Sequence, residues 1–344
     1  LAASSTAEYV IWQDTRDDAG DVYAHKLDPS GSYLWAGELK VNQNVVGSSQ
    51  TNARTGLDRY ERLYAVWQDN RNGDYDIYGE RFSTTGGAPA PTWGSEVKFN
   101  RNADNADQTN PALAIQSLDD DVTLNLYVAW QDLRTGDSDI YLTRYDAGGN
   151  PAWASEVRVN SDASGTGVVQ ENPSLVVDAS GNITVVWQDG RNGSSDIYLQ
   201  QLDAAGAKLI PFDVRINATS ANAQERPMVT LTSGGYPLIV WHDNTAGNWD
   251  VKAAVFGADV ATITPVGNVP VVVSGAKRIG ENPVILKYSQ SHTTDGAGTA
   301  VIGDLEWDPG YSFAPTGFTL LRVEPEQPVP VAPLSNATVY LNLQ

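Results

Sequence analysis

The chain has 344 residues, ten tryptophans, no cysteine and a formal net charge of -20 at pH 7. So acidic a protein repels phosphate backbones, which argues against nucleic acid as a partner. The absence of cysteine excludes disulfides and thiolate metal sites, and the lack of an apolar run near 18 residues predicts no membrane span.

Five copies of one hairpin signature follow each other between residues 12 and 250. They read VIWQDTRDDAGDVY, AVWQDNRNGDYDIY, VAWQDLRTGDSDIY, VVWQDGRNGSSDIY and IVWHDNTAGNWDVK. Their tryptophans lie 55, 63, 57 and 54 residues apart and are Trp12, Trp67, Trp130, Trp187 and Trp241. An aspartate lies nine residues after each: Asp21, Asp76, Asp139, Asp196 and Asp250. A β-branched run, a turn of Asp, Asn and Gly, and a second alternating run predict a β-hairpin in every copy.

Two further strands accompany each hairpin. An outer strand reads ELKVN at 38–42 and recurs as EVKFN, EVRVN and DVRIN, while an inner strand begins Gln-x-Asn/Arg, as in QTNPALAI at 108. Four-stranded units repeated in this way predict an all-β fold, a five-bladed β-propeller over residues 1–286. We expect the strand near 281–286 to complete the first blade and VPVVV at 269–273 to be the fifth outer strand.

Six blades are the alternative, with residues 281–344 as a degenerate sixth blade and residues 1–3 as a remnant inner strand. In the five-bladed interpretation, residues 287–344 form a C-terminal β-rich segment or a small β-sandwich.

The motif resembles a known repeat. Asp-Asn-Arg-Asn-Gly at 69–73, followed by Asp-Ile-Tyr at 76–78, is similar to the repeats of TolB-like, PD40-type β-propellers of secreted and surface bacterial proteins. The resemblance covers about residues 1–286 and implies a fold, whereas function has to be argued from a site.

The acidic hairpin turns have two interpretations. In the first they bind calcium through clustered oxygen ligands, namely Asp69, Asp74 and Asp76 in copy two and Asp243, Asn248 and Asp250 in copy five. In the second, which we favour, the arginine four residues after each Trp pairs with the Asp that opens the next strand. These arginines are Arg16, Arg71, Arg134 and Arg191, and copy five has Thr245 instead.

The repeated tryptophans are expected to fill the space between adjacent sheets. Trp249 and Tyr75 lie within turns and are the better candidates for contact with a ligand.

Catalytic motifs are absent from the sequence, and the three histidines show no ligand spacing. Five-bladed propellers include glycosidases with paired carboxylates in the central funnel, but here the acidic residues repeat with the blades. We therefore expect an extracellular or cell-surface, non-catalytic propeller for binding, adhesion or assembly, with a protein or glycan partner. A surface filament subunit that self-assembles through its C-terminal strands is one form of this hypothesis. The alternative is a carbohydrate-active propeller, either a lectin or a glycoside hydrolase.

Overall fold

The computed structural model describes residues 1–257, apart from 17–18, 44–46, 86–87, 102–104, 118–123, 163–164 and 219–221, and beyond them only strands between 270 and 343. The chain divides into two units, Leu1–Ala258 and Asp259–Gln344. The division lies earlier than the expected boundary at residue 286. No helix of a length and hydropathy suited to crossing a bilayer occurs in the described part of the chain.

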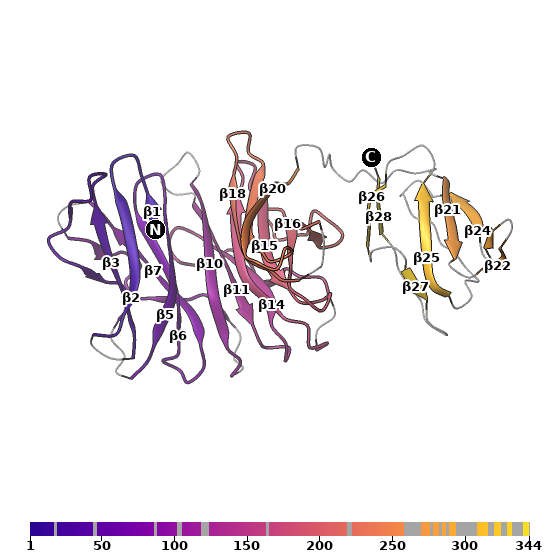
Figure 1. Cartoon of the computed structure of the whole chain (residues 1–344). Coiled ribbons are helices and arrows are strands. Elements are labelled where there is room, and N and C mark those ends of the chain that lie inside the picture. The colour runs from indigo at the N-terminus through magenta and orange to yellow at the C-terminus, as the bar shows by residue number, and fades with distance from the viewer. Residues whose placement is uncertain are drawn as a thin grey trace. The chain divides into compact units, whose positions relative to one another are not determined.

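The first unit is all-β and consists of five antiparallel sheets in chain order (Figure 1). Sheet one contains β1 (Ala2–Ala3), β2 (Glu8–Asp14), β3 (Asp21–Leu27) and β4 (Leu39–Lys40). Sheet two contains β5 (Gln50–Leu57), β6 (Leu63–Asp69) and β7 (Asp76–Ser83), with β8 (Ala90–Pro91) and β9 (Val97–Lys98) both on β7. Sheet three contains β10 (Gln108–Ser117), β11 (Leu124–Asp132), β12 (Asp139–Tyr145) and β13 (Val157–Arg158). Sheet four contains β14 (Gln170–Val177), β15 (Ile183–Asp189), β16 (Asp196–Leu202) and β17 (Val214–Arg215). Sheet five has β18 (Gln224–Leu231), β19 (Pro237–Asp243) and β20 (Asp250–Val255).

The hairpin signature sets the register of the two middle strands. In sheet three Trp130 pairs with Tyr141, and Asp132 pairs with Asp139 at the turn. The turn contains Gly136 at a φ of 95°, a left-handed conformation that glycine adopts without steric cost. Gly73, Gly193 and Gly247, which take the same position in the turns of sheets two, four and five, also have positive φ.

The tryptophans pack each sheet onto the one before it. Trp187 lies in one apolar cluster with Tyr127 and Ala129 of sheet three, and Trp241 lies in another with Val186 and Ile197 of sheet four. The side chains of Trp67, Trp130 and Trp187 are completely buried, and Trp241 is nearly so. Trp12 is only half-buried. Sheets two to five thus pack a tryptophan face onto the preceding sheet, whose opposite face supplies aliphatic side chains. In sheets one to three a tyrosine and a second tryptophan join these aliphatic side chains.

Side-chain amides link the inner strands of neighbouring sheets. Each inner strand from β5 to β18 has a bulge with a left-handed residue: Asn52, Asn110, Asn172 and Arg226. The Gln of the Trp-Gln-Asp motif reaches these bulges. Gln68 Oε1 accepts hydrogen bonds from Asn52 Nδ2 in its own sheet and from the backbone N of Asn110 in the next, each at 3.0 Å. Gln131 and Gln188 accept equivalent bonds. We call this series of contacts the amide belt.

The second unit is also made of strands. β21 (Pro270–Gly275), β24 (Ser289–Thr293), β25 (Asp308–Pro315) and β27 (Val329–Val331) form one sheet. Two strand pairs complete it: β22 (Arg278–Glu281) with β23 (Val284–Leu286), and β26 (Leu320–Glu324) with β28 (Tyr340–Leu343).

Two of the expected strand assignments were wrong. The segment 281–286 pairs within the β22–β23 hairpin, and β1 takes the inner position of sheet one. The segment 269–273 falls largely in β21, which pairs with β24 and β25 rather than with β20. Strand propensity identified these segments as strands, but their partners depend on contacts that are distant in sequence.

Candidate functional site

The repeated arginines hold a polar cluster at the hairpin turns of sheets one to four. Arg71 binds Asp69 at 2.5 Å and Glu96 at 2.6 Å, and its guanidinium lies 4.2 Å from the ring centroid of Tyr78. Asp69 is fully buried and also accepts a hydrogen bond from Trp67 Nε1 at 3.2 Å. Arg16, Arg134 and Arg191 make equivalent contacts with Asp14, Asp132 and Asp189. These residues form a structural bridge within each sheet.

These arginines do not bind the carboxylate that was expected from the sequence. The aspartate that opens the third strand instead binds a cation of the outer strand: Asp21 binds Lys40, Asp76 binds Lys98, Asp139 binds Arg158 and Asp196 faces Arg215. An asparagine of the outer strand donates to the same carboxylate, as Asn100 does to Asp76 at 2.7 Å. The outer strand therefore neutralises this aspartate.

The proposed calcium ligands do not converge. Asp69 and Asp76 are buried and bound to Arg71 and Lys98, and Asp74 is half-buried. In copy five Asp243 is buried, whereas Asn248 and Asp250 are exposed. Among the described residues no group of three His, Asp or Glu side chains could hold a metal ion. Calcium binding at these turns stays a prediction.

The two candidate contact aromatics differ in exposure. Trp249 is 52 % exposed, with its ring 6.3 Å from that of His242. Tyr75 is half-buried, and its backbone N donates to Asp107 Oδ1 at 2.9 Å. They lie in the turns of sheets five and two respectively.

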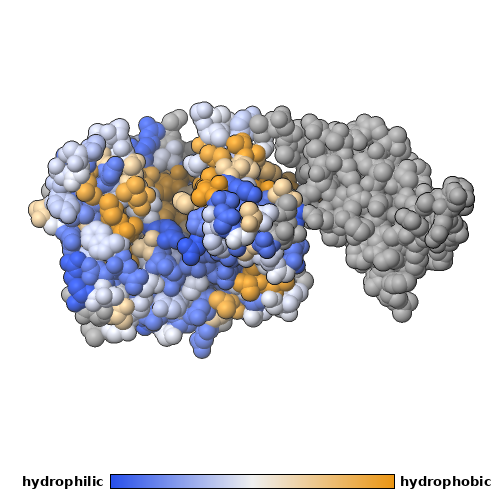
Figure 2. All heavy atoms as spheres, viewed as in Figure 1, coloured by the Kyte–Doolittle hydropathy of each residue, from blue (hydrophilic) through white to orange (hydrophobic). Residues whose placement is uncertain are grey.

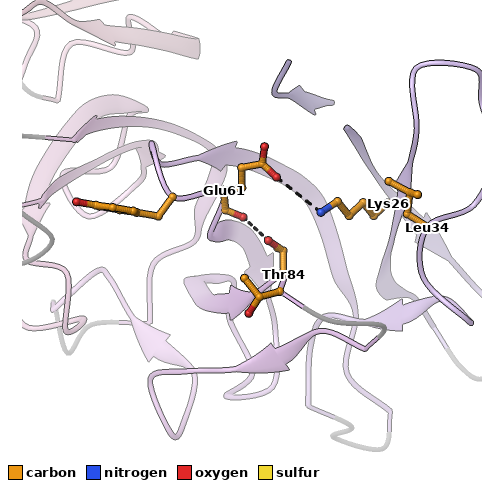
Figure 3. A pocket seen from close by; sticks show the side chains of 6 residues that line it. Lys26, Leu34, Glu61 and Thr84 are labelled. Carbon is orange, nitrogen blue, oxygen red and sulfur yellow. Dashed lines mark hydrogen bonds and ion pairs between the residues drawn. The ribbon is translucent and has the colours of Figure 1, made fainter. Parts of the chain in front are cut away.

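A pocket beside sheet two was missed by the sequence analysis (Figure 3). It has a volume of about 450 Å³, within the range of about 300–1,000 Å³ typical of small-molecule sites. Its lining consists of Lys26, Leu34, Tyr60, Glu61, Thr84 and Thr85. Tyr60 is 41 % exposed and Leu34 is also exposed. The pocket thus combines an aromatic ring, an aliphatic side chain, hydroxyls and one ion pair.

Glu61 departs from the repeat at this pocket. It lies in the β5–β6 turn at a φ of 58°, where the equivalent turns of sheets four and five have Gly181 and Gly235. A non-glycine residue in this conformation costs free energy of order 1–3 kcal/mol and is found most often at functional sites. The repeat alignment alone would have shown a glutamate in place of glycine, and this signal was available from the sequence.

Several groups hold the Glu61 carboxylate in place. Thr6 Oγ1 donates to it at 3.0 Å, Tyr9 OH donates at 3.5 Å, and Lys26 Nζ lies 3.7 Å away. Thr84 donates to the Glu61 backbone carbonyl, and Figure 3 shows Lys26, from β3, and Thr84, which follows β7, pointing toward Glu61. Hydrogen bonds from Ser4 and Thr6, helped by Lys26, lower the pKa of Glu61 despite some burial. The carboxylate is therefore ionised at neutral pH and 31 % exposed to solvent.

No protein-family model and no curated protein matches the chain, but solved structures do. A protein of unknown function from Dyadobacter fermentans aligns with a TM-score of 0.50 at 10 % identity, over 75 % of this chain and 78 % of that one. An endo-arabinase from Bacteroides thetaiotaomicron aligns with a TM-score of 0.45 at 14 % identity, over 74 % and 92 %. The GH93 α-L-arabinofuranosidase of Fusarium graminearum gives 0.46 at 11 % identity, over 72 % and 71 %. The first of these shows a similarity of fold alone, to a protein of unknown function.

The expected function was wrong. A non-catalytic propeller for binding, adhesion or assembly was predicted, but the solved structures that match include glycoside hydrolases and favour the carbohydrate-active alternative. At such low identities the likeness shows the fold alone, so the geometry of a site has to carry the functional argument. The resemblance to TolB-like repeats stays a prediction.

Proposed function

We propose that this chain is a carbohydrate-active β-propeller that binds a glycan in the Glu61 pocket. The observation that carries the proposal is Glu61 itself, an ionised carboxylate held in a left-handed conformation beside an exposed tyrosine. Glycine takes the same position in sheets four and five, so the turn itself does not require a glutamate there.

The lining groups suit the two sides of a sugar ring. Glu61 accepts hydrogen bonds from hydroxyls, while Lys26 and Thr85 donate them. Tyr60 and Leu34 offer apolar surface to the C–H face of a pyranose or furanose ring. Glycosidases use a pair of carboxyl groups, and Glu61 is the one carboxylate among the lining residues. The pocket therefore supports glycan binding more directly than hydrolysis.

A glycan-binding screen on the full chain tests the proposal, followed by calorimetry on any ligand found. Glu61→Gly is the decisive variant, because the equivalent turns already contain glycine and the fold should be retained. It is expected to lose the ligand and to stay folded, because relief of the left-handed conformation offsets the carboxylate contacts with Thr6, Tyr9 and Lys26 that are lost. Tyr60→Ala should weaken binding, whereas Ser180→Ala, the matched change in sheet four, should not. Binding that persists unchanged in Glu61→Gly would overturn the proposal, as would the absence of any ligand.

Hydrolysis is tested on the same panel of glycans. Turnover that survives Glu61→Gly would place the chemistry elsewhere in the chain and would also overturn the assignment of this pocket.

We further propose that the five sheets are the blades of a five-bladed propeller. The uncovered faces of its two end sheets support this closure. The tryptophan face of sheet one carries Val10 and Trp12, and the aliphatic face of sheet five carries Met228 and Val251, which are 66 % and 74 % exposed. Figure 2 shows apolar side chains over β1–β2 and over β18–β20, on either side of a hollow. The surface charge fits an extracellular or cell-surface location, which we propose for the same chain.

A further inference from the structure

Sheet five lacks the arginine cluster that the other four sheets share. Thr245 stands where Arg71, Arg134 and Arg191 stand, and Lys252 replaces the tyrosine on which those arginines stack. The outer-strand acid that binds the arginine, Glu96 in sheet two, has no counterpart among the described residues of this three-stranded sheet.

A cavity occupies the position of the missing arginine. It has a volume of about 380 Å³, and its lining includes Trp241, Asp243, Thr245 and Lys252 of sheet five, with Ile216 and Ala218 from the end of sheet four. In sheet four the equivalent space is filled by Arg191, whose guanidinium lies 4.2 Å from the ring centroid of Tyr198. The cavity therefore keeps the tryptophan and the aspartate that surround the arginine in the other sheets, with Lys252 in place of the tyrosine.

Asp243 is the group that would recognise the ligand. It is 3 % exposed, and its Oδ2 accepts a hydrogen bond from Trp241 Nε1 at 3.3 Å. Its counterpart Asp189 binds Arg191 through both oxygens, with Nε at 2.9 Å and NH2 at 2.6 Å. In sheet five the nearby cation is Lys252, whose Nζ lies 3.0 Å from Asp243 Oδ1 and whose side chain is 48 % exposed.

Asp243 is ionised over the physiological range. Burial alone would raise its pKa, but hydrogen bonds from Thr245, Lys252 and Trp241 outweigh it and lower the pKa to about 2. A compact ammonium contacts a carboxylate at one point, whereas a guanidinium meets both oxygens in one plane. Lys252 is exposed enough to move into solvent and leave both oxygens to such a group.

A second polar group borders the cavity. In the preceding sheets the residue after the outer-strand asparagine donates its backbone N–H to the acid of the next sheet, as Ser161 does to Asp213 at 2.8 Å. Ala218 is the equivalent of Ser161 and lies in the cavity lining. A ligand that carries an acid close to its guanidinium would supply the two groups that sheet five lacks, the arginine and the acid of the outer strand.

We propose that this cavity is a binding site for a guanidinium group, supplied by an arginine of a peptide ligand. Asp243 binds the guanidinium, and the backbone N–H of Ala218 binds a neighbouring acid of the same peptide. The site is separate from the Glu61 pocket and independent of the proposed glycan.

Calorimetry on the full chain tests this site with N-acetyl-arginine amide and N-acetyl-lysine amide. The arginine compound is expected to bind at least about tenfold more tightly, because it makes two charge-assisted hydrogen bonds where lysine makes one. Short peptides that contain arginine with and without a nearby glutamate distinguish a peptide site from a site for free guanidinium compounds. The peptide with the acid should bind most tightly. Equal affinity with and without the acid would refute the role of Ala218.

Thr245→Arg provides the sharper test, because it restores the residue of the other copies. It should raise the melting temperature and abolish binding of the arginine compound, while Thr245→Ala, the matched control, should keep binding. Asp243→Asn should also abolish binding. Equal affinity for arginine and lysine, no binding at millimolar ligand, or undiminished binding in Thr245→Arg would overturn the proposal.

Discussion

Replacing Arg134 by methionine should destabilise the first unit far more than the same change at Arg16. The two arginines occupy equivalent positions in sheets three and one. Arg134 binds Asp132 at 2.5 Å and Glu156 at 2.6 Å, and the two carboxylates are 0 % and 6 % exposed. Methionine keeps most of the aliphatic volume and removes only the charge and its hydrogen bonds.

The expected magnitude follows from what remains buried. Without the guanidinium, Asp132 keeps hydrogen bonds from Trp130 Nε1 at 2.7 Å and from the backbone N of residue 134 at 2.9 Å, but loses its counter-charge. Removal of one partner of a buried ion pair costs about 3–5 kcal/mol of unfolding free energy. Arg16 is 47 % exposed, and its partners Asp14 and Glu38 are 18 % and 39 % exposed, so water and salt screen both pairs more than those of Arg134. The decrease in unfolding free energy caused by Arg16→Met should therefore be close to the error of the measurement.

Urea denaturation of both variants at neutral pH and moderate salt measures the difference. The midpoint should fall strongly for Arg134→Met and barely for Arg16→Met, with similar slopes. Equal losses for the two variants would refute the argument, because burial is what distinguishes the two sites.

Three further predictions concern the pocket, the ring and the turns. The pKa of Glu61 is lowered, so its carboxylate stabilises the fold above its ordinary pKa of 4.5 and this contribution is lost as the pH falls through the folded-state value. Glu61→Gln should therefore be less stable than the wild type at neutral pH and equal to it in acid; a gap that widened in acid would contradict this. The chain has no native cysteine, so Val10→Cys combined with Val251→Cys should form an intramolecular disulfide if the five sheets close on each other. A monomeric double variant in which the two cysteines stay reduced would favour the six-bladed alternative. Arg71 already neutralises Asp69, so we expect the melting temperature to stay constant when calcium or a chelator is added. A rise of the melting temperature with calcium would support calcium binding at the hairpin turns.

Local sequence determined more of this fold than of its site. The spacing from Trp130 to Asp139 specifies a hairpin of fixed register, because alternation and turn chemistry act within a few residues. Inner strands were also identifiable from their Gln-x-Asn beginnings. The pairing of segments distant in sequence could not be predicted. Residues 1–3 were expected as an inner strand only in the six-bladed alternative, and the partners of β21 and β22 lie in the second unit.

The polar contacts were harder to assign than the strands. Arg71 was expected to bind Asp76, yet the backbone turns so that Arg71 reaches back to Asp69 while Lys98 covers Asp76. The amide belt depends on a bulge at Asn110 that no periodicity reveals. Glu61 was not among the expected site residues, because those were chosen at positions that repeat in every copy. Glu61 breaks the repeat, since the equivalent turns have Gly181 and Gly235.

The packing of each tryptophan face onto the preceding sheet gives the first unit a direction. Sheets two to four are each covered on both sides, but the outer face of sheet five is exposed at Met228, Val251 and Val255. Each repeated sheet is stabilised mainly by its neighbours, and the contact of the three-stranded sheet five with sheet one would be the weakest point of the proposed ring. Thermal opening should therefore begin at the fifth sheet and move towards the centre, where sheet three would protect its backbone amides from deuterium longest. The sheets of the first unit would then unfold one after another rather than in a single cooperative transition.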